Sequence, residues 1–187
     1  LVGSEKCIRD RMKIVFSNTT EVGIQLVQDD ITNEPPVSFP GKLLAFLYER
    51  FKAFNGSHES GIVIVPTELI TDNGTKLEGI VLELAHRNNL DYKFIEWLEN
   101  HNTFCNSLVD RIVPGKPNAA DSKKIETALG YQDELMTMSE VFRLWAIEGD
   151  DKVKEVLSFG KVDKAVIIAP DITLFKELKP VSYTHLT

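Results

Sequence analysis

The sequence predicts an α/β fold with a mixed sheet, and three observations carry that prediction. Short apolar runs of strand length occur at residues 14–16, 61–66 and 164–170. An amphipathic helical pattern separates the first two runs and others follow the second, and this alternation is typical of the α/β class. The later strands come without long helices between them, so we expect some antiparallel pairing.

The first predicted strand lies in residues 12–24, MKIVFSNTTEVGI, and its apolar run stops abruptly at the polar loop 17–21. In open α/β sheets ligands bind at such strand ends, so this loop is a candidate wall of a nucleotide or substrate cleft. Ser, Asn and Thr also favour turns and helix N-caps, so a plain capped turn explains the same residues. The residues alone leave both interpretations open.

A loop with two prolines follows at residues 29–39, and residues 41–54 then predict a helix with leucine and phenylalanine on one face. Asn55 and Gly56 are typical of the end of a helix. Residues 61–66 form a continuous β-branched run, which indicates a strand buried on both faces in a parallel sheet. Strand, helix and strand together predict a right-handed βαβ unit.

The rest of the chain continues the alternation. A polar loop at residues 67–74 precedes two predicted helices, at 75–87 and 92–102. The remaining predicted elements are, in order, a strand at 107–113, a weak helix or loop at 119–129, a strand at 139–148, a short segment at 153–159, a strand at 164–170 and a helix at 171–179.

Composition excludes several classes of function. The chain has 187 residues, a formal net charge of −7 and a sequence pI of about 5.2, so it lacks the basic surplus that binding to a nucleic acid backbone requires. A small anionic substrate remains possible, because it needs only a local basic site. No stretch approaches the apolar length of a membrane span, and we expect no membrane partner. The two cysteines form no disulfide framework and no secretory signal is visible, so a cytoplasmic location is expected.

Both ends of the chain differ in character from its interior. Residues 1–11 closely resemble the translation of a transposon-based sequencing-library adapter, with Lys6 as the one departure, and residues 181–187 resemble the same adapter read from the other end. We therefore expect residues 1–11 and 180–187 to be non-native and exclude them from the fold prediction.

Polar loops follow three predicted strands, at residues 17–21, 67–74 and 109–115, and their side chains suit hydrogen bonding to ribose, phosphate or sugar hydroxyls. Asp110 and Arg111 lie inside an apolar run, where charges are costly unless they are paired or functional. The pair is therefore either a structural salt bridge or part of a site.

Other reactive side chains give weaker signals. Lys176 and Lys179 in the last predicted helix are either solvated or, if burial lowers a pKa, able to act as a general acid or base. The histidines lack ligand spacing such as HxxxH, so no metal site is expected. No glycine-rich nucleotide motif (GxGxxG or Walker A) and no GxSxG motif is present.

Taken together, five blocks resemble the long-chain mannitol dehydrogenase family: FSNTTEVGI, PGKLLAFLYERFKAFNG, IVPTELITDNG, FIEWLENHNTFCNSLVDRIVPG and FKELK. The SNTTE, ELITDNG and CNSLVDRIV blocks are similar to its branch that reduces keto-hexuronates. The resemblance implies that residues 12–170 are the C-terminal part of a Rossmann-like NAD-binding domain and that residues 171–179 begin an all-α C-terminal domain. It further implies NAD as cofactor, a small sugar acid as substrate and no metal.

The resemblance also implies site residues. Lys179 matches the family's catalytic lysine, which begins a Lys-x-x-x-x-Asn-x-x-His motif, whereas the Asn and His positions hold Thr184 and Thr187. The residues expected to line the cofactor cleft are Asn18, Thr19, Thr20 and Glu21. Those expected near the junction of cofactor and substrate are Glu68, Asn73, Asp110 and Arg111.

Two alternatives accompany this assignment. One is a related mannonate or mannitol dehydrogenase. The other, of a different class, is a truncated nucleotide-binding module without catalytic activity, because the glycine-rich loop expected before residue 12 is absent.

Overall fold

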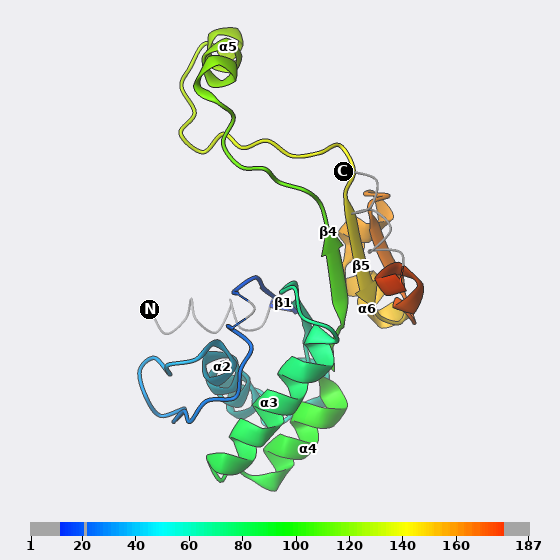
Figure 1. Cartoon of the computed structure of the whole chain (residues 1–187). Coiled ribbons are helices and arrows are strands. Elements are labelled where there is room, and N and C mark those ends of the chain that lie inside the picture. The colour runs from blue at the N-terminus through cyan, green and yellow to red at the C-terminus, as the bar shows by residue number, and fades with distance from the viewer. Residues whose placement is uncertain (1–11, 21, 178–187) are drawn as a thin grey trace.

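A computed structural model describes residues 12–20 and 22–177, and it shows an α/β body from which a long arm projects (Figure 1). The first sheet is parallel, in the order β1-β2-β3, and its strands are β1 (Ile14–Ser17), β2 (Val63–Pro66) and β3 (Thr103–Phe104). The second sheet has the order β4-β5-β6, and its strands are β4 (Ser107–Asp110), β5 (Leu144–Glu148) and β6 (Val166–Ala169). β4 pairs antiparallel with β5, and β5 pairs parallel with β6. The α/β prediction is confirmed, and the mixed pairing belongs to the second sheet.

Three helices build the main core around the first sheet: α2 (Phe39–Ala53), α3 (Asn73–Arg87) and α4 (Tyr92–His101). All four residues of β2 are buried, as its continuous apolar run predicts for a central parallel strand. The helices bury one apolar face each, and the fully buried leucines Leu44, Leu77 and Leu98 represent the three faces. The βαβ unit predicted from residues 14–66 is present as β1, α2 and β2.

Local capping sets where these helices begin. The Ser38 side chain accepts a hydrogen bond from the Gly41 backbone N–H, and Pro40 lies in the first turn of α2. Asp91 caps α4 by accepting from the Lys93 backbone N–H at 2.8 Å. The helices predicted at 41–54, 75–87 and 92–102 are therefore confirmed, with every boundary within two residues of its predicted position.

The loop before α2 is closed by a buried carboxylate, Asp29, which is 4% exposed. Its oxygens accept hydrogen bonds from the Ser38 hydroxyl and backbone N–H, both at 2.7 Å, and from the Val37 N–H at 3.0 Å. Burial alone would raise the pKa of Asp29, but these hydrogen bonds outweigh it and hold the pKa below its ordinary value of 3.8.

This carboxylate gives a pH-dependent prediction. Because its folded-state pKa is lowered, Asp29 contributes stability above pH 3.8 that is lost as the pH falls through the folded-state pKa. Asp29→Asn is expected to lower the free energy of unfolding near neutral pH. The difference in this free energy between the variant and the unsubstituted chain should shrink as the pH falls below 3.8. Urea unfolding at a series of pH values between neutral and strongly acid measures it, and a difference that stays constant throughout would contradict it.

The second sheet carries a smaller core with α6 (Asp151–Val156) and the 3-10 helix η2 (Ser158–Lys161). Phe16 on β1 contacts Trp145 on β5 with ring centroids 5.5 Å apart, and Trp145 stacks on Phe159 at 5.6 Å. The two sheets are thus linked by aromatic contact as well as by the chain. The apolar run at residues 164–170 is confirmed as the strand β6.

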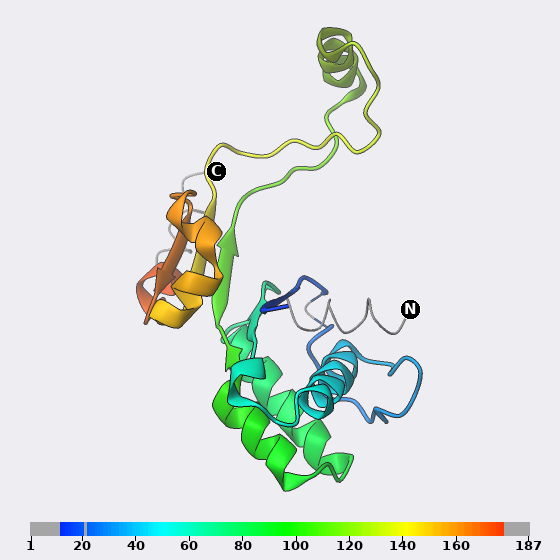
Figure 2. The same cartoon turned by 180° about the vertical axis from the view of Figure 1, so that it is seen from behind.

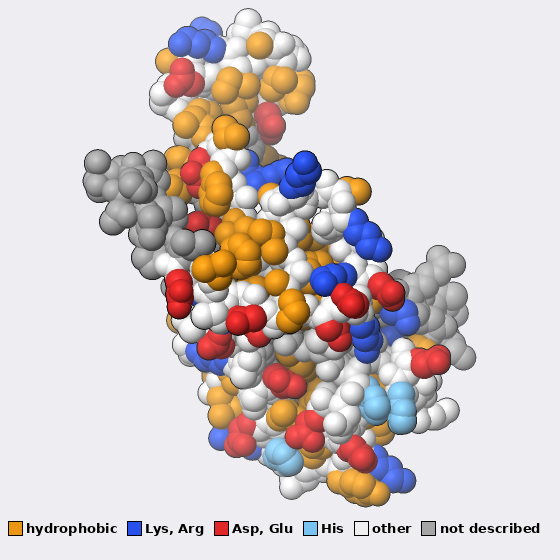
Figure 3. Space-filling model, turned by 90° about the vertical axis from the view of Figure 1, so that its right-hand side faces the viewer, with side chains coloured by type: hydrophobic (Ala, Val, Ile, Leu, Met, Phe, Trp, Pro, Cys, Tyr) orange, Lys and Arg blue, Asp and Glu red, His pale blue; other side chains and the backbone are white. Residues whose placement is uncertain are grey.

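The arm consists of residues 111–143 and contains α5 (Ala119–Leu129), which buries none of its side chains (Figures 1 and 2). The strands predicted at 107–113 and 139–148 are wrong at these ends, because β4 stops at Asp110 and β5 starts at Leu144. The chain leaves the sheet there, and Val141 in the arm is 97% exposed. Figure 3 shows hydrophobic side chains at the surface of this arm. The segment predicted as a weak helix or loop is a helix, capped by Asn118 and ended by Gly130 at φ +80°.

The last described residues, 173–177, are helical, and Asp171 accepts from the Thr173 backbone N–H at 2.7 Å. The helix predicted at 171–179 is therefore observed as far as residue 177. Glu21, Lys179 and the two end segments assigned to an adapter lie outside the described residues. No described helix is both long and apolar enough to cross a lipid bilayer.

Candidate functional site

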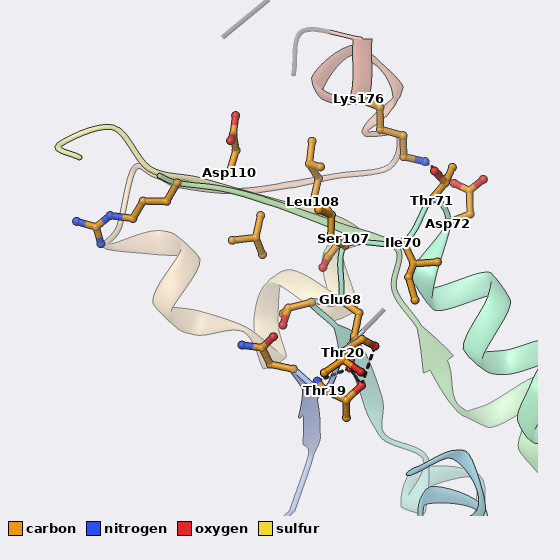
Figure 4. A pocket seen from close by; sticks show the side chains of 15 residues that line it. Thr19, Thr20, Glu68, Ile70, Thr71, Asp72, Ser107, Leu108, Asp110 and Lys176 are labelled. Atoms are coloured by element: carbon orange, nitrogen blue, oxygen red, sulfur yellow. Dashed lines mark hydrogen bonds and ion pairs between the residues drawn. The ribbon is translucent and has the colours of Figure 1, made fainter. Parts of the chain in front are cut away.

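A cleft of about 760 Å³ opens at the carboxyl ends of β1 and β2 and runs along β4 (Figure 4). Its lining comes from residues 18–20 after β1, residues 67–72 after β2, residues 107–111 of β4 and its exit, and Lys176 of the terminal helix. The carboxyl ends of parallel strands meet at one sheet edge, which is where ligands bind in open α/β sheets. The three polar loops that the sequence analysis singled out therefore do converge.

One wall of the cleft is held by a single buried carboxylate, Glu68, which is 4% exposed. Its Oε1 accepts from the Thr19 backbone N–H at 2.9 Å and from the Thr19 hydroxyl at 2.8 Å. Its Oε2 accepts from the Ser17 hydroxyl at 3.0 Å. Three donors from the last residue of β1 and the loop after it thus point at one side chain from the loop after β2, which fixes the end of β1 and the two loops against each other.

The Glu68 network predicts a defined effect of substitution. Glu68→Gln replaces one acceptor oxygen with an NH₂ group, which only donates. The side chain can therefore no longer accept hydrogen bonds from both Thr19 and Ser17. We expect a loss of about 2 kcal/mol in the free energy of unfolding. Urea denaturation measures this, and the exposed control Glu49→Gln should stay within about 0.5 kcal/mol of the unsubstituted chain.

Asn73, predicted near the junction of cofactor and substrate, lies beneath the cleft and is 1% exposed. Its Nδ2 donates to the backbone carbonyls of Pro66, Glu68 and Ser107 at 3.0 to 3.1 Å. Its Oδ1 accepts from the backbone N–H groups of Ser107 at 2.8 Å and Gly74 at 2.9 Å. Both ends of the amide are occupied by protein, so Asn73 joins the strand ends that form the floor of the cleft.

Asp110 and Arg111 both line the cleft, but their side chains separate. Asp110 ends β4 and is 7% exposed. Arg111 begins the arm, and its guanidinium donates through Nε and Nη2 to the Glu140 carbonyl at 3.3 and 3.1 Å. Consecutive residues of an extended chain point to opposite faces, which explains the separation.

An ion pair that the sequence does not predict lies at the edge of the cleft. Lys176 Nζ lies 2.6 Å from Asp72 Oδ1, which joins the terminal helix to the start of α3 (Figure 4). For Lys176 the sequence predicts only a general acid or base or a solvated side chain. Asp72 had no signal of its own, because an Asp before a helix is an ordinary N-cap residue.

The predicted site residues therefore fall into three groups. The structure brings together at the cleft Asn18, Thr19, Thr20, Glu68, Asp110 and Arg111. Asn73 lies beneath it, and Glu21 and Lys179 are outside the described residues. Within residues 12–20 and 22–177, no group of three or more His, Cys, Asp or Glu side chains could hold a metal ion.

Comparison with known proteins gives consistent matches. The model of the mannitol dehydrogenase Rossmann domain matches residues 3–159, a range that begins inside the segment assigned to an adapter. The altronate oxidoreductase of Bacillus subtilis is 45% identical over 172 residues, which is 91% of this chain and 35% of that protein. That of Pectobacterium carotovorum is 45% identical over 169 residues, which is 90% of this chain and 34% of that protein. The chain thus spans about a third of the length of these relatives.

Two solved structures share the fold. A substrate-free D-sorbitol dehydrogenase superposes with a TM-score of 0.64 at 23% identity, covering 92% of this chain and 37% of that one. The mannitol 2-dehydrogenase of Pseudomonas fluorescens, in a ternary complex with NAD and D-mannitol, superposes with a TM-score of 0.65 at 21% identity, covering 95% of this chain and 38% of that one.

Proposed function

The chain belongs to the mannitol dehydrogenase family, and from this premise we propose that its whole protein is an NAD-dependent oxidoreductase that interconverts D-tagaturonate and D-altronate. The observation that carries the proposal is the identity of 45% over nine-tenths of the chain to proteins named altronate oxidoreductase. The activity belongs to the whole protein because the chain spans about a third of those relatives.

The cleft suits a nicotinamide cofactor. It lies at the carboxyl ends of parallel strands, its volume is within the usual range for ligand pockets, and its β1 wall presents hydroxyl and amide groups. Asn18, Thr19 and Thr20 would hold the cofactor, together with Glu21 of the same loop. When bound, NAD supplies the acceptor for the hydride of the alcohol carbon and, as NADH, returns it to the ketone.

Proton transfer is assigned to Lys179. Its support is its match to the lysine that begins the family motif and its position three residues beyond Lys176, which lines the cleft. In oxidation the neutral amine takes the proton of the hydroxyl group that becomes a carbonyl. In reduction the ammonium returns that proton to the developing alkoxide. Glu68 and Asn73 contribute by holding the loops that form the cleft, and Asp110 and Arg111 lie on its β4 side.

The experiment compares substrates with the purified full-length protein. NADH formation is followed with D-altronate, D-mannonate and D-mannitol at equal concentrations. We expect kcat/KM for altronate to exceed both others at least tenfold. A preference for mannonate or mannitol would assign the protein to one of those related dehydrogenases instead.

A second proposal concerns the 187-residue chain by itself, and it too rests on the share of the relatives that the chain spans. We propose that the isolated chain does not turn over altronate and acts at most as a nucleotide-binding module. Turnover by the purified chain with NAD and altronate would contradict it, and calorimetric titration with NADH measures any cofactor binding.

A further inference from the structure

The ion pair between Asp72 and Lys176 occupies the edge of the cleft and connects residues 104 positions apart (Figure 4). The two side chains are 52% and 31% exposed, so solvent or a ligand can reach both. Exposed pairs contribute little to stability, typically below about 1 kcal/mol. Stability alone is therefore a weak reason for placing a charged pair here.

Asp72 is set up unusually for a residue that precedes a helix. Its backbone is left-handed, with φ +51° and ψ +47°, and its side chain makes no capping hydrogen bond to α3. An N-cap aspartate normally accepts from the first turn of its helix. Here the carboxylate is instead directed at Lys176, in a backbone conformation that non-glycine residues seldom adopt.

Two other charged side chains that line the cleft, Arg111 and Glu68, already have hydrogen-bond partners. Arg111 donates to the Glu140 carbonyl in the arm, and the Glu68 carboxylate accepts three hydrogen bonds from Ser17 and Thr19. Of the two cationic side chains in the described lining, Lys176 is the one whose ammonium is directed at the cleft edge. An ammonium carries three N–H donors, and Asp72 accepts one of them.

We infer that Lys176 is the residue that selects substrates carrying a carboxylate, with Asp72 as its ion-pair partner at the edge of the cleft. The inference rests on the proposed function and names the group that recognises the acid end of the substrate. The substrate carboxylate accepts from a second N–H of Lys176. A neutral hexitol with the same carbon chain offers no such charge-assisted contact.

The two members of the pair therefore differ in their expected effects. Removing the ammonium of Lys176 removes its contact with the substrate carboxylate. This is expected to lower kcat/KM for the sugar acid about 10- to 100-fold and to leave kcat/KM for the hexitol unchanged. Removing the Asp72 charge leaves the ammonium in the cleft, so the preference for the acid is kept. A purely structural ion pair predicts instead that both substitutions have the same effect on both substrates.

The test uses the full-length protein and the ratio of kcat/KM for altronate to that for the hexitol of matching hydroxyl configuration. The variants are Lys176→Met, Lys176→Arg and Asp72→Asn. The matched control is Lys154→Met on α6, whose ammonium lies 2.9 Å from Asp151 and does not line the cleft. We expect the ratio to fall 10- to 100-fold in Lys176→Met and to stay within about threefold in the other three variants.

Each outcome is decisive. The inference is overturned if the ratio of kcat/KM for altronate to that for the hexitol is unchanged in Lys176→Met, or if it falls equally in Asp72→Asn. In either case altronate turnover by the unsubstituted protein still upholds the proposed function. No altronate turnover by the unsubstituted protein overturns both. If Lys176→Met fails to fold, judged by its thermal melt, Lys176→Gln is scored by the same ratio.

Discussion

Replacing Asn73 with alanine is expected to lower the free energy of unfolding by about 3 to 4 kcal/mol, the largest loss that any polar substitution at the cleft should cause. The side chain is 1% exposed and forms five hydrogen bonds with backbone groups of Pro66, Glu68, Ser107 and Gly74. Alanine removes all five hydrogen bonds at once, and it deprives the buried Ser107 N–H of the Asn73 oxygen that accepts from it at 2.8 Å.

Urea denaturation of the isolated chain measures the effect, with the slope m compared to confirm a cooperative transition. The matched control is Asn100→Ala on α4, whose amide donates to the Glu96 carbonyl at 2.8 Å on an exposed helix face. That variant should stay within about 0.5 kcal/mol of the unsubstituted chain. Equal losses in both variants would show that Asn73 has no special role beneath the cleft.

The second large effect concerns activity. Lys179→Met is expected to lower kcat for altronate oxidation by about 10³-fold in the full-length protein, because it removes the proposed general acid and base. KM for altronate should change far less, since the loss falls on the reacting proton rather than on binding. The affinity for NADH, measured by calorimetry, should stay within about twofold because the β1 wall is untouched.

Chemical rescue makes this test specific. A small primary amine added to Lys179→Met should restore part of kcat, with a rise that depends on the fraction of neutral amine. Lys164→Met, at an exposed position beside β6, is the control and should retain full activity. A loss of less than tenfold in Lys179→Met would assign the proton transfer to another group.

The sequence was a good guide to the elements of this fold and to which loops form the cleft. The β-branched run of β2 and the apolar faces of α2, α3 and α4 are local patterns, and a local pattern predicts burial directly. The adapter-like ends and Lys179 are also sequence observations, and they stay predictions.

The sequence was a poorer guide where long-range contacts decide the outcome. Both predicted strands extend into the arm, at residues 111–113 and 139–143, because the apolar residues there are compatible with a strand. A strand lasts only as long as its partner, and β4 and β5 part after Asp110 and before Leu144. Asp72 and Lys176 form an ion pair although they are 104 residues apart in the sequence. A local sequence pattern does not predict a contact between residues so far apart.

What the sequence by itself determined is the α/β class, the family blocks and the polar loops at the strand ends, because periodicity and local composition are written in neighbouring residues. Only the tertiary structure decided what those loops do with their side chains. It buries Asn73 as the tie between strand ends, turns Arg111 toward the arm and sets Lys176 against Asp72. Hydrogen bonds and ion pairs depend on distance in space, which separation along the chain does not reveal.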